Sequence, residues 1–274
     1  MSEPSRSFTF NRMQNGQIVE ETGHVITEMA VSLTVNGEVW LTFMCTPVDL
    51  EALAVGFLFN EGLIQEREQI ADVRVCATGD NIDVWTTKSI RRPRQWRKTS
   101  GCTGGVTSVE SERSNEVGAV NKNGGILSSD EIAELVDDLF STQKLYRLTG
   151  GVHTSTLTDG KGHFVTAEDI GRHNTLDKIA GKCLLENIRL TRRILLTTGR
   201  ISSEMLQKAA RIKAAVLISR TSPSTLSIDL AEQTGITLIG YARRNQFTIY
   251  THPERIVSSN PLVEIQPTSS LSNP

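Results

Sequence analysis

The sequence predicts an α/β fold in which a smaller N-terminal α+β part, a β-hairpin and a helix, precedes an α/β domain. Apolar and polar residues alternate on both sides of the turn dipeptide Asn36-Gly37, which is typical of a β-hairpin. From about residue 144 onward, strand-like and helix-like patterns alternate, which favours helices packed over a shared sheet. The chain has 274 residues, a length that suits about two domains.

Composition and charge narrow the class of protein. With 38% hydrophobic and 22% charged residues, the chain can bury a sizeable core. The 29 basic and 31 acidic residues give a net charge of −2, which argues against broad nucleic-acid binding and leaves room for a local basic patch. No apolar run reaches the ~18 residues of a membrane span, and residues 1–16 lack the apolar core of a signal peptide. We therefore expect a cytoplasmic protein without membrane contacts.

Four segments follow from the composition along the chain. Residues 1–23 are polar and 258–274 are rich in Ser and Pro, so both ends are expected to be flexible. Between them we expect an N-terminal domain over 24–125 and a C-terminal domain over 126–257. The boundary is placed near 109–127, which is polar and rich in Gly.

The hairpin over 31–43 opens the N-terminal domain. A helix is predicted from Thr46-Pro47 to about Asn60, because Thr46 precedes Asp49 by three residues and Gly62 lies beyond the end. Short strand-like runs follow at 73–75 and 82–85. Residues 91–108 break every periodic pattern and are predicted to be a mobile loop.

The C-terminal domain opens with a capping box. Ser128 and Glu131 have the spacing of that motif, and apolar residues keep helical spacing behind them to about Phe140. Asn174 and Asp177 are expected to cap a later helix that places Cys183 on its apolar face. The remaining predicted elements are a strand at 194–197, a helix from Ser202 or Ser203 to about Ala214, a strand at 216–219, a helix from Ser222-Pro223 to Gly235, and extended segments at 236–240 and 247–249.

Cys102 is the thiol whose surroundings best suit chemistry. It lies in a loop of Gly, Ser and Thr that follows a basic run. Positive charge favours the thiolate, which is the nucleophilic form, although an ordinary loop cysteine beside a solvated basic stretch fits equally well. No Cys-x-x-Cys pair suggests a zinc or dithiol site, and core packing is expected for the other three cysteines. The basic run consists of Arg91, Arg92, Arg94, Arg97 and Lys98.

Three Gly-rich segments lie at predicted junctions of strands and helices. They are 149–153 (TGGVH), 169–174 (DIGRHN) and 198–203 (TGRISS). The second and third lead into helix N-termini, where anions bind readily. None is a complete Walker or GxGxxG motif, so tight-turn geometry remains an equal explanation.

Two further groups of residues are candidates for a site. His153 and His173 could act as general bases, although a structural histidine is commoner, and the His-x-Glu and Pro-Cys-x-x-Cys ligands of a zinc deaminase are missing. Metal catalysis is therefore disfavoured. Residues 240–246 follow a predicted strand, where Arg243 and Arg244 would suit phosphate contacts and Tyr241 could stack on a ring. A charged hairpin turn is the alternative.

Long strings of this sequence resemble the FdhD family of formate dehydrogenase accessory proteins. The resemblance runs from about Glu28 to Ile256, and several unusual strings occur in the same order. The strings are 46–64 (TPVDLEALAVGFLFNEGLI), 149–155 (TGGVHTS), 168–181 (EDIGRHNTLDKIAG), 197–210 (TTGRISSEMLQKAA), 219–243 (SRTSPSTLSIDLAEQTGITLIGYAR) and 250–256 (YTHPERI).

The resemblance implies a sulfur carrier of the sulfurtransferase type. Such a protein takes sulfur from a cysteine desulfurase as a Cys102 persulfide and passes it to the molybdenum cofactor, bis-molybdopterin guanine dinucleotide, before the cofactor enters formate dehydrogenase. It further implies a homodimer and a C-terminal domain like a three-layer cytidine deaminase without its zinc. The implied cofactor-binding residues are Tyr241, Ala242, Arg243, Arg244, Asn245 and Gln246.

Two positions depart from the family pattern. The family loop is typically Cys-Gly-x-Cys-Gly, and here Gly105 stands where the second cysteine would be. One persulfide needs only one sulfur nucleophile, so carriage survives, but a step that uses a resolving thiol is in doubt. Tyr241 stands where Phe is usual.

Two other functions remain open at this point. A chaperone could hold the cofactor for formate dehydrogenase without covalent sulfur chemistry. A cysteine-dependent acyl or amide transferase could use Cys102 with His153 or His173, although no oxyanion motif supports it.

Overall fold

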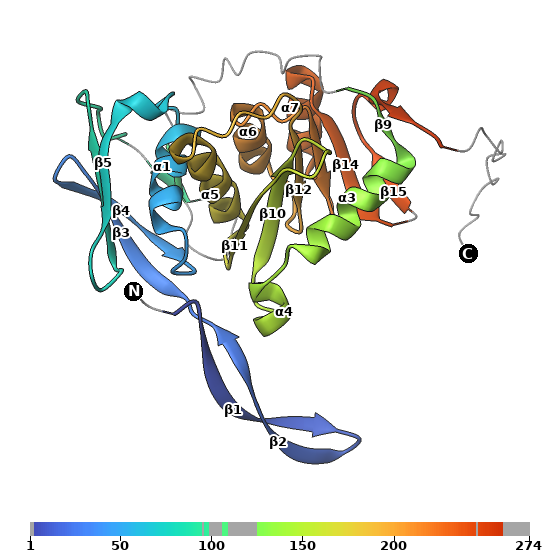
Figure 1. Ribbon diagram of the computed structural model, residues 1–274, viewed down its shortest axis with the longest axis horizontal. Coiled ribbons are helices and arrows are strands. Elements are labelled where there is room, and N and C mark those ends of the chain that lie inside the picture. Colours follow the sequence, from blue (N-terminus) through green and yellow to red (C-terminus); the bar gives the residue numbers. More distant parts are fainter. Residues whose placement is uncertain (1–2, 95, 99–105, 109–124, 245, 260–274) are drawn as a thin grey trace, which may run out of the picture.

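The computed structural model describes residues 3–94, 96–98, 106–108, 125–244 and 246–259. A two-stranded arm, a small N-terminal domain and a larger C-terminal domain follow one another (Figure 1). None of the helices in these residues is long and apolar enough to cross a membrane.

The arm consists of β1 (Ser5–Gln14) and β2 (Gln17–Ile26), which pair antiparallel and project from the body (Figure 1). Asn15 and Gly16 join them with φ of 50° and 79°, as a type I′ turn requires. This regular hairpin differs from our expectation of a flexible terminus over 1–23. The Asn-Gly turn and the β-forming residues of both strands specify a ribbon despite the polar composition.

The N-terminal domain is a four-stranded sheet in the order β4-β3-β6-β5, covered by one helix. The predicted hairpin at Asn36-Gly37 is confirmed, and so are the two short strands. Phe57 of the helix meets Phe43 of the sheet edge to face, with 5.2 Å between ring centroids. The elements are β3 (Met29–Val35), β4 (Glu38–Cys45), α1 (Leu50–Asn60), the short η1 (Arg67–Gln69), β5 (Ile70–Val75) and β6 (Asn81–Thr86).

The predicted start of α1 is wrong, because the helix begins at Leu50 and not at Thr46. Thr46 instead bonds to the C-terminal domain: its hydroxyl accepts from the Ile170 N–H at 3.1 Å, and its own N–H donates to Asp169 at 3.1 Å. A tertiary contact has therefore replaced the local cap. The predicted end is confirmed, with Gly62 at φ 73° just beyond the helix.

Part of the predicted loop at 91–108 is also regular. β7 (Trp96–Lys98) and β8 (Val106–Ser108) pair antiparallel, so the prediction of a loop is wrong for these residues. Cys102 lies between them in the sequence and outside the described residues. The predicted boundary at 109–127 also falls outside them, apart from residues 125–127.

The C-terminal domain is built on a six-stranded sheet in the order β11-β10-β12-β13-β14-β15. The three central strands β12, β13 and β14 are parallel, and the outer pairings are antiparallel. The strands are β10 (His153–Thr158), β11 (Phe164–Asp169), β12 (Ile194–Thr197), β13 (Val216–Ser219), β14 (Thr237–Arg243) and β15 (Gln246–Ile249).

Helices cover both faces of this sheet and make three layers. α3 (Ser129–Ser141) crosses one face, while α5 (Arg172–Leu185), α6 (Ser203–Arg211) and α7 (Thr225–Thr234) pack in series over the other (Figure 1). The Ser128–Glu131 capping box is confirmed. The short elements are β9 (Leu127–Ser128), α4 (Leu145–Thr149), η2 (Pro253–Arg255) and β16 (Ile256–Val257), of which β9 and β16 pair with each other.

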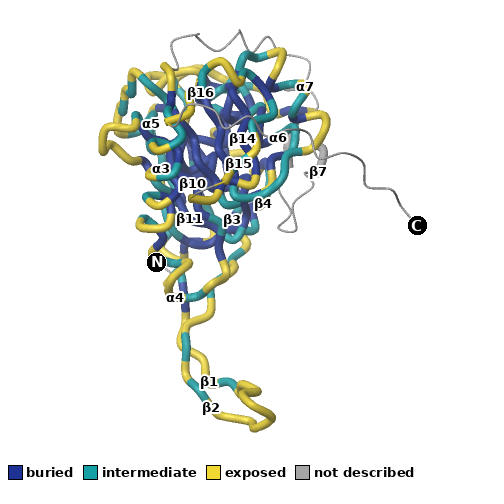
Figure 2. The backbone as a smooth tube through the Cα atoms, turned by 90° about the vertical axis from the view of Figure 1, so that its right-hand side faces the viewer, coloured by how far each residue is buried: buried dark blue, intermediate teal, exposed yellow. Residues whose placement is uncertain are grey.

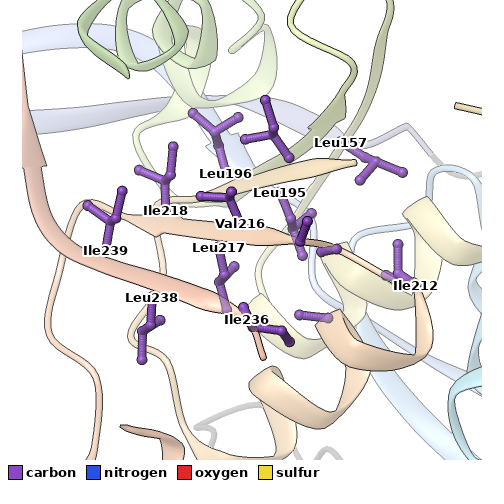
Figure 3. Packing of buried hydrophobic residues seen from close by; sticks show 14 of the residues in the cluster. Leu157, Leu195, Leu196, Ile212, Val216, Leu217, Ile218, Ile236, Leu238 and Ile239 are labelled. Carbon is purple, nitrogen blue, oxygen red and sulfur yellow. The ribbon is translucent and has the colours of Figure 1, made fainter. Parts of the chain in front are cut away.

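The core of this domain lies on both sides of the parallel strands. Leu196, Ile218 and Ile239 project from one side of the sheet, and Leu217 and Leu238 from the other (Figure 3). Strands buried on both faces read as continuous apolar runs, which is why β12 and β13 were predictable from sequence.

The two domains meet through α1 and α5. A Cβ on Gly56 would overlap the backbone of Asp177, and one on Gly181 would overlap the backbone of Ala52, so the helices approach as closely as their backbones allow. The prediction that Asn174 and Asp177 cap α5 is wrong, because both residues lie at this junction. Both are buried, and Asp177 accepts from Asn60 of α1 at 2.7 Å.

Candidate functional site

A cavity of about 570 Å³ opens at the carboxyl ends of the parallel strands. This edge of an open α/β sheet is where ligands usually bind. Its lining comes from α3, α4, the ends of β10 and β11, and the segments after β12 and β13. The lining residues are Phe140, Gln143, Tyr146, Gly150, Gly151, Val152, His153, Ile170, Thr198, Arg220, Thr221 and Arg243.

The three Gly-rich segments converge on this cavity. Gly150, Gly151 and His153 come from the first, Ile170 from the second and Thr198 from the third. A close approach explains why one position in these segments is a glycine. A Cβ on Gly199 would lie 2.8 Å from the Cβ of Arg172. The segments therefore serve as tight junctions and also line one cavity.

Two arginines supply the charge of the cavity. The Arg220 guanidinium stacks over the Phe140 ring, 4.3 Å from its centroid, and its Nε is buried with no hydrogen-bond partner among the described residues. Burial lowers the pKa of Arg220, and the charge of Arg243 lowers it further. Among the described residues, the lining includes no carboxylate, so an anion such as a phosphate would satisfy both cations.

His153 lies on the wall beside Thr198. Its Nδ1 is 3.3 Å from the Thr198 hydroxyl, which also accepts from the Thr154 N–H at 3.1 Å. Burial lowers the pKa of His153, and the charge of Arg172 lowers it further. The imidazole is therefore neutral near pH 7 and can donate or accept a single hydrogen bond toward a ligand.

Glu168 fixes the rim of the cavity. Its carboxylate accepts the backbone N–H groups of Lys144, Leu145 and Tyr146 at 2.9, 2.8 and 2.9 Å. These bonds satisfy the first N–H groups of α4 and set the position of Tyr146. Glu168 therefore acts on the site through the backbone of α4.

Asp169 ties the floor of the site to the N-terminal domain. Its carboxylate is 2.6 Å from the Lys178 ammonium, and both side chains are fully buried. The same carboxylate accepts from Asn174 at 2.9 Å and from the Thr46 N–H at 3.1 Å. With each oxygen bonded, the buried charge is compensated and the strand end is held rigidly.

Of the six predicted cofactor residues, the structure brings Arg243 to the cavity. Tyr241 is half-exposed with φ 51° and does not line it, and Ala242 is buried in the core. Arg244 is exposed and pairs with Asp137 at 3.3 Å. Gln246 is exposed on β15, and Asn245 lies outside the described residues.

Sequence reasoning missed Arg220, Phe140 and Tyr146. Arg220 had a readable signal, since it directly follows the predicted strand 216–219 in a parallel sheet. The two rings had none, because only the packing of α3 and α4 against the sheet brings them to the strand ends.

Two of the described cysteines are poor nucleophiles. Burial raises the pKa of Cys45 to about 12, and it also raises the pKa of Cys183, which packs beside the core. Cys76 is partly exposed, and its Sγ accepts from the Asn81 N–H at 3.2 Å. The thiolate proposed from sequence, Cys102, lies outside the described residues.

His173 lies at the start of α5 and is buried. Neither ring nitrogen has a hydrogen-bond partner in the part of the chain that the structure describes. Burial, followed by the charge of Lys208, lowers its pKa well below the usual value. Within the same residues, no group of three or more His, Cys, Asp and Glu side chains is placed to hold a metal ion.

Comparisons with known proteins agree on one family. The model of the FdhD/NarQ family matches residues 26–257. A sulfur carrier protein FdhD from Staphylococcus aureus strain MRSA252 is 35% identical over 251 residues, which cover 90% of this chain and 95% of that protein. A second, from S. aureus strain RF122, is 34% identical with the same coverage.

A solved structure is similar over almost the whole chain. It is the crystal structure of a formate dehydrogenase accessory protein from Desulfotalea psychrophila, with a TM-score of 0.76 and 30% sequence identity. The match covers 93% of this chain and 100% of that one. The α/β fold class predicted from sequence is thereby confirmed.

Proposed function

The chain belongs to the FdhD/NarQ family, and we propose that it is a sulfur carrier that serves formate dehydrogenase. In this proposal Cys102 takes sulfur from a cysteine desulfurase and passes it to the molybdenum cofactor. The C-terminal cavity holds that cofactor by its guanine nucleotide end. The observation that carries the proposal is the pair Arg220 and Arg243 in a cavity with no carboxylate among the lining residues that the structure describes.

The cavity suits a nucleotide in size and chemistry. Its volume of about 570 Å³ falls within the usual range for small-ligand sites. Arginine forks bind phosphate oxygens bidentately, and the rings of Phe140 and Tyr146 offer apolar surface to a base. A phosphate would also partner the buried Nε of Arg220.

The sulfur step needs a thiolate. The Cys102 thiolate attacks the terminal sulfur of the desulfurase persulfide, so that a new S–S bond forms at Cys102 while the donor S–S bond breaks and the donor cysteine leaves as thiolate. No net oxidation occurs. The neighbouring cationic residues Arg97 and Lys98 favour the thiolate in sequence, whereas burial disfavours it at Cys45 and Cys183.

A cofactor-binding chaperone is the second candidate. The described residues that line the cavity all belong to the C-terminal domain. A protein of that kind would hold and deliver the cofactor without becoming persulfidated.

Intact-protein mass spectrometry separates the two candidates. The chain is incubated with an active cysteine desulfurase and cysteine, then measured before and after reduction. The carrier predicts a reducible gain of one sulfur that disappears in Cys102→Ala and persists in the matched control Cys76→Ala. A gain that survives in Cys102→Ala contradicts Cys102 as the residue that carries sulfur, whereas no gain in the unmodified chain contradicts the carrier and leaves the chaperone.

A further inference from the structure

A separate cavity of about 430 Å³, the junction cavity, lies where the two domains meet. One wall comes from Phe59 and residues 65–68 of the N-terminal domain, and the other comes from the C-terminal ends of α5 and α6. Arg193 and Lys213 line it just before β12 and β13 begin, so it lies at the amino ends of these strands, whereas the candidate site lies at their carboxyl ends. Residues 65–68 and 183–190 are exposed or half-buried, so the junction cavity opens outside the dark-blue core of the body (Figure 2).

Cations outnumber carboxylates around the junction cavity. Five cationic side chains line it, against the carboxylates of Glu66 and Glu68. Counting the nearby Glu61 as well still leaves the cations in excess. In the part of the chain that the structure describes, none of the five forms a salt bridge. The five are Arg67, Arg189, Arg193, Arg211 and Lys213.

The carbonyl groups at the ends of helices are the first explanation to weigh, because cations gather there for structural reasons. α1, α5 and α6 all end near this cavity, each followed by a residue in the left-handed conformation. The N–H of the next residue then bonds back to the helix, so these carbonyls already have partners. The bonds are Leu63 N–H to Leu58 O at 2.9 Å, Ile188 N–H to Cys183 O at 2.9 Å and Ala214 N–H to Ala209 O at 3.0 Å.

Structural bonds account for three of the five cations. Each of the three donates to an oxygen of the chain nearby, which fixes its guanidinium. The bonds are Arg193 Nη1 to Ile212 O at 2.6 Å, Arg67 Nη1 to Ile70 O at 2.7 Å and Arg189 Nε to Asn187 Oδ1 at 3.2 Å.

Arg211 is the buried cation that these bonds leave over. Its guanidinium lies against Gly62, where an added Cβ would be 2.8 Å from Nη2 and 2.9 Å from Nη1. Burial lowers the pKa of Arg211, and the charge of Glu61 opposes this shift. Its N–H donors make no hydrogen bond within the described residues. A guanidinium withdrawn from water without a partner is costly, and an anion in the cavity would supply the missing acceptor.

The floor of the junction cavity is apolar. Phe59, Leu184 and Ile188 line it and also pack against the hydrophobic cores of the domains. Burial raises the pKa of Cys183, which lines the same floor, so its thiol is neutral and adds no negative charge. A ligand that fits therefore needs an apolar body as well as a negative group.

We propose that the junction cavity binds a small organic anion in which a phosphate or carboxylate group is attached to an apolar body. The anionic group pairs with Arg211 and with the exposed Lys213, while the body lies on Phe59 and Leu184. The volume falls within the usual range for small-ligand sites. The proposal stands independently of the sulfur chemistry, because the two cavities share none of the lining residues that the structure describes.

Three probes with the same ring system test the proposal. They are 1-naphthyl phosphate, 1-naphthoate and the neutral 1-naphthalenemethanol. Hydrogen–deuterium exchange of the full chain, measured by mass spectrometry over a range of probe concentrations, gives a dissociation constant for each segment. We expect 1-naphthyl phosphate to slow exchange at residues 186–193 and the neutral alcohol to bind there about tenfold more weakly or worse. Tighter binding of the phosphate than of the carboxylate indicates a phosphate ligand, and the reverse order indicates a carboxylate.

Substitutions test which cations hold the anion. Arg211→Gln should raise the dissociation constant of 1-naphthyl phosphate at residues 186–193 about tenfold, because it removes a charged hydrogen-bond donor. Lys213→Gln changes an exposed side chain and should raise it about threefold, since exposed ion pairs contribute less. Arg244→Gln is the matched control and should leave it unchanged, because that exposed arginine pairs with Asp137 and lines neither cavity.

Three results would overturn the proposal. The first is protection by 1-naphthyl phosphate at residues 144–153 alone, which would assign the probe to the candidate site, or no protection at millimolar concentration. The second is equal binding of the phosphate and the neutral alcohol, as a merely apolar hollow predicts. The third is a dissociation constant in both Arg211→Gln and Lys213→Gln that equals that of Arg244→Gln.

Discussion

Gly56 of α1 lies against the backbone carbonyl of Asp177 in α5, so closely that no side chain fits between the helices. This contact joins the N-terminal domain to the C-terminal domain, which holds the cavity. The reciprocal contact of Gly181 with Ala52 makes the junction two-sided. The two domains are therefore held as one unit.

Substituting that glycine should loosen the junction. Gly56→Ala forces the helices apart, and overpacking of a tight core costs about 1–3 kcal/mol or more. We expect a lower midpoint of urea unfolding for Gly56→Ala. Glu51→Ala, on the same helix, is the control and should change the free energy of unfolding by less than about 0.5 kcal/mol. Equal stability of the two variants would show that the junction is not close-packed.

The buried ion pair beneath the site gives a second prediction. Lys178→Met leaves the Asp169 carboxylate buried without its cation, which typically costs about 3–5 kcal/mol. Lys182→Met is the control, because its pair with Asp49 at 2.6 Å is partly exposed and such pairs contribute about 0–1 kcal/mol. Chemical denaturation measures both. A Lys178→Met loss no larger than the control would contradict the role of this pair.

His173 should make folding sensitive to acid. Its pKa is lowered well below the usual value in the folded protein, so the unfolded chain binds more protons below a pH of about 6.5. The stabilisation is therefore complete above that pH and is lost as the pH falls. We expect His173→Gln to flatten the dependence of unfolding free energy on pH between about 5 and 7. An unaltered slope in His173→Gln would refute this assignment.

The two cavity arginines should control nucleotide binding. Guanosine diphosphate serves as the probe in isothermal titration calorimetry. Arg243→Ala and Arg220→Ala should each weaken binding about tenfold or more, because each removes a charged hydrogen-bond donor. Arg244→Ala is the matched control, since that side chain is exposed and pairs with Asp137 outside the cavity. Equal losses in all three variants would point to nonspecific electrostatics.

Local signals predicted those parts of the fold that local interactions determine. Neighbouring residues alone were enough to predict the Asn36-Gly37 hairpin, the Ser128–Glu131 capping box and the apolar runs of β12 and β13. The same turn dipeptide at Asn15-Gly16 was equally informative, but the polar composition of the segment concealed it.

Tertiary contacts determined what the sequence did not predict. Thr46 and Asn174 have the chemistry of helix caps, yet both bond across the domain junction. For the site, two of the three glycine segments and Arg243 were predictable because they lie at the ends of strands. Arg220 follows a strand in the same way, whereas Phe140 joins them only because α3 lies across the sheet.

In the proposed mechanism, Cys102 carries sulfur to a cofactor held near Arg243. The most direct test is formate dehydrogenase activity in cells that lack their own accessory protein and express this chain or a variant. We predict that the unmodified chain and Cys76→Ala restore activity and that Cys102→Ala and Arg243→Ala do not. Full activity with Cys102→Ala, alongside failure of Arg243→Ala, would contradict the carrier and establish a chaperone.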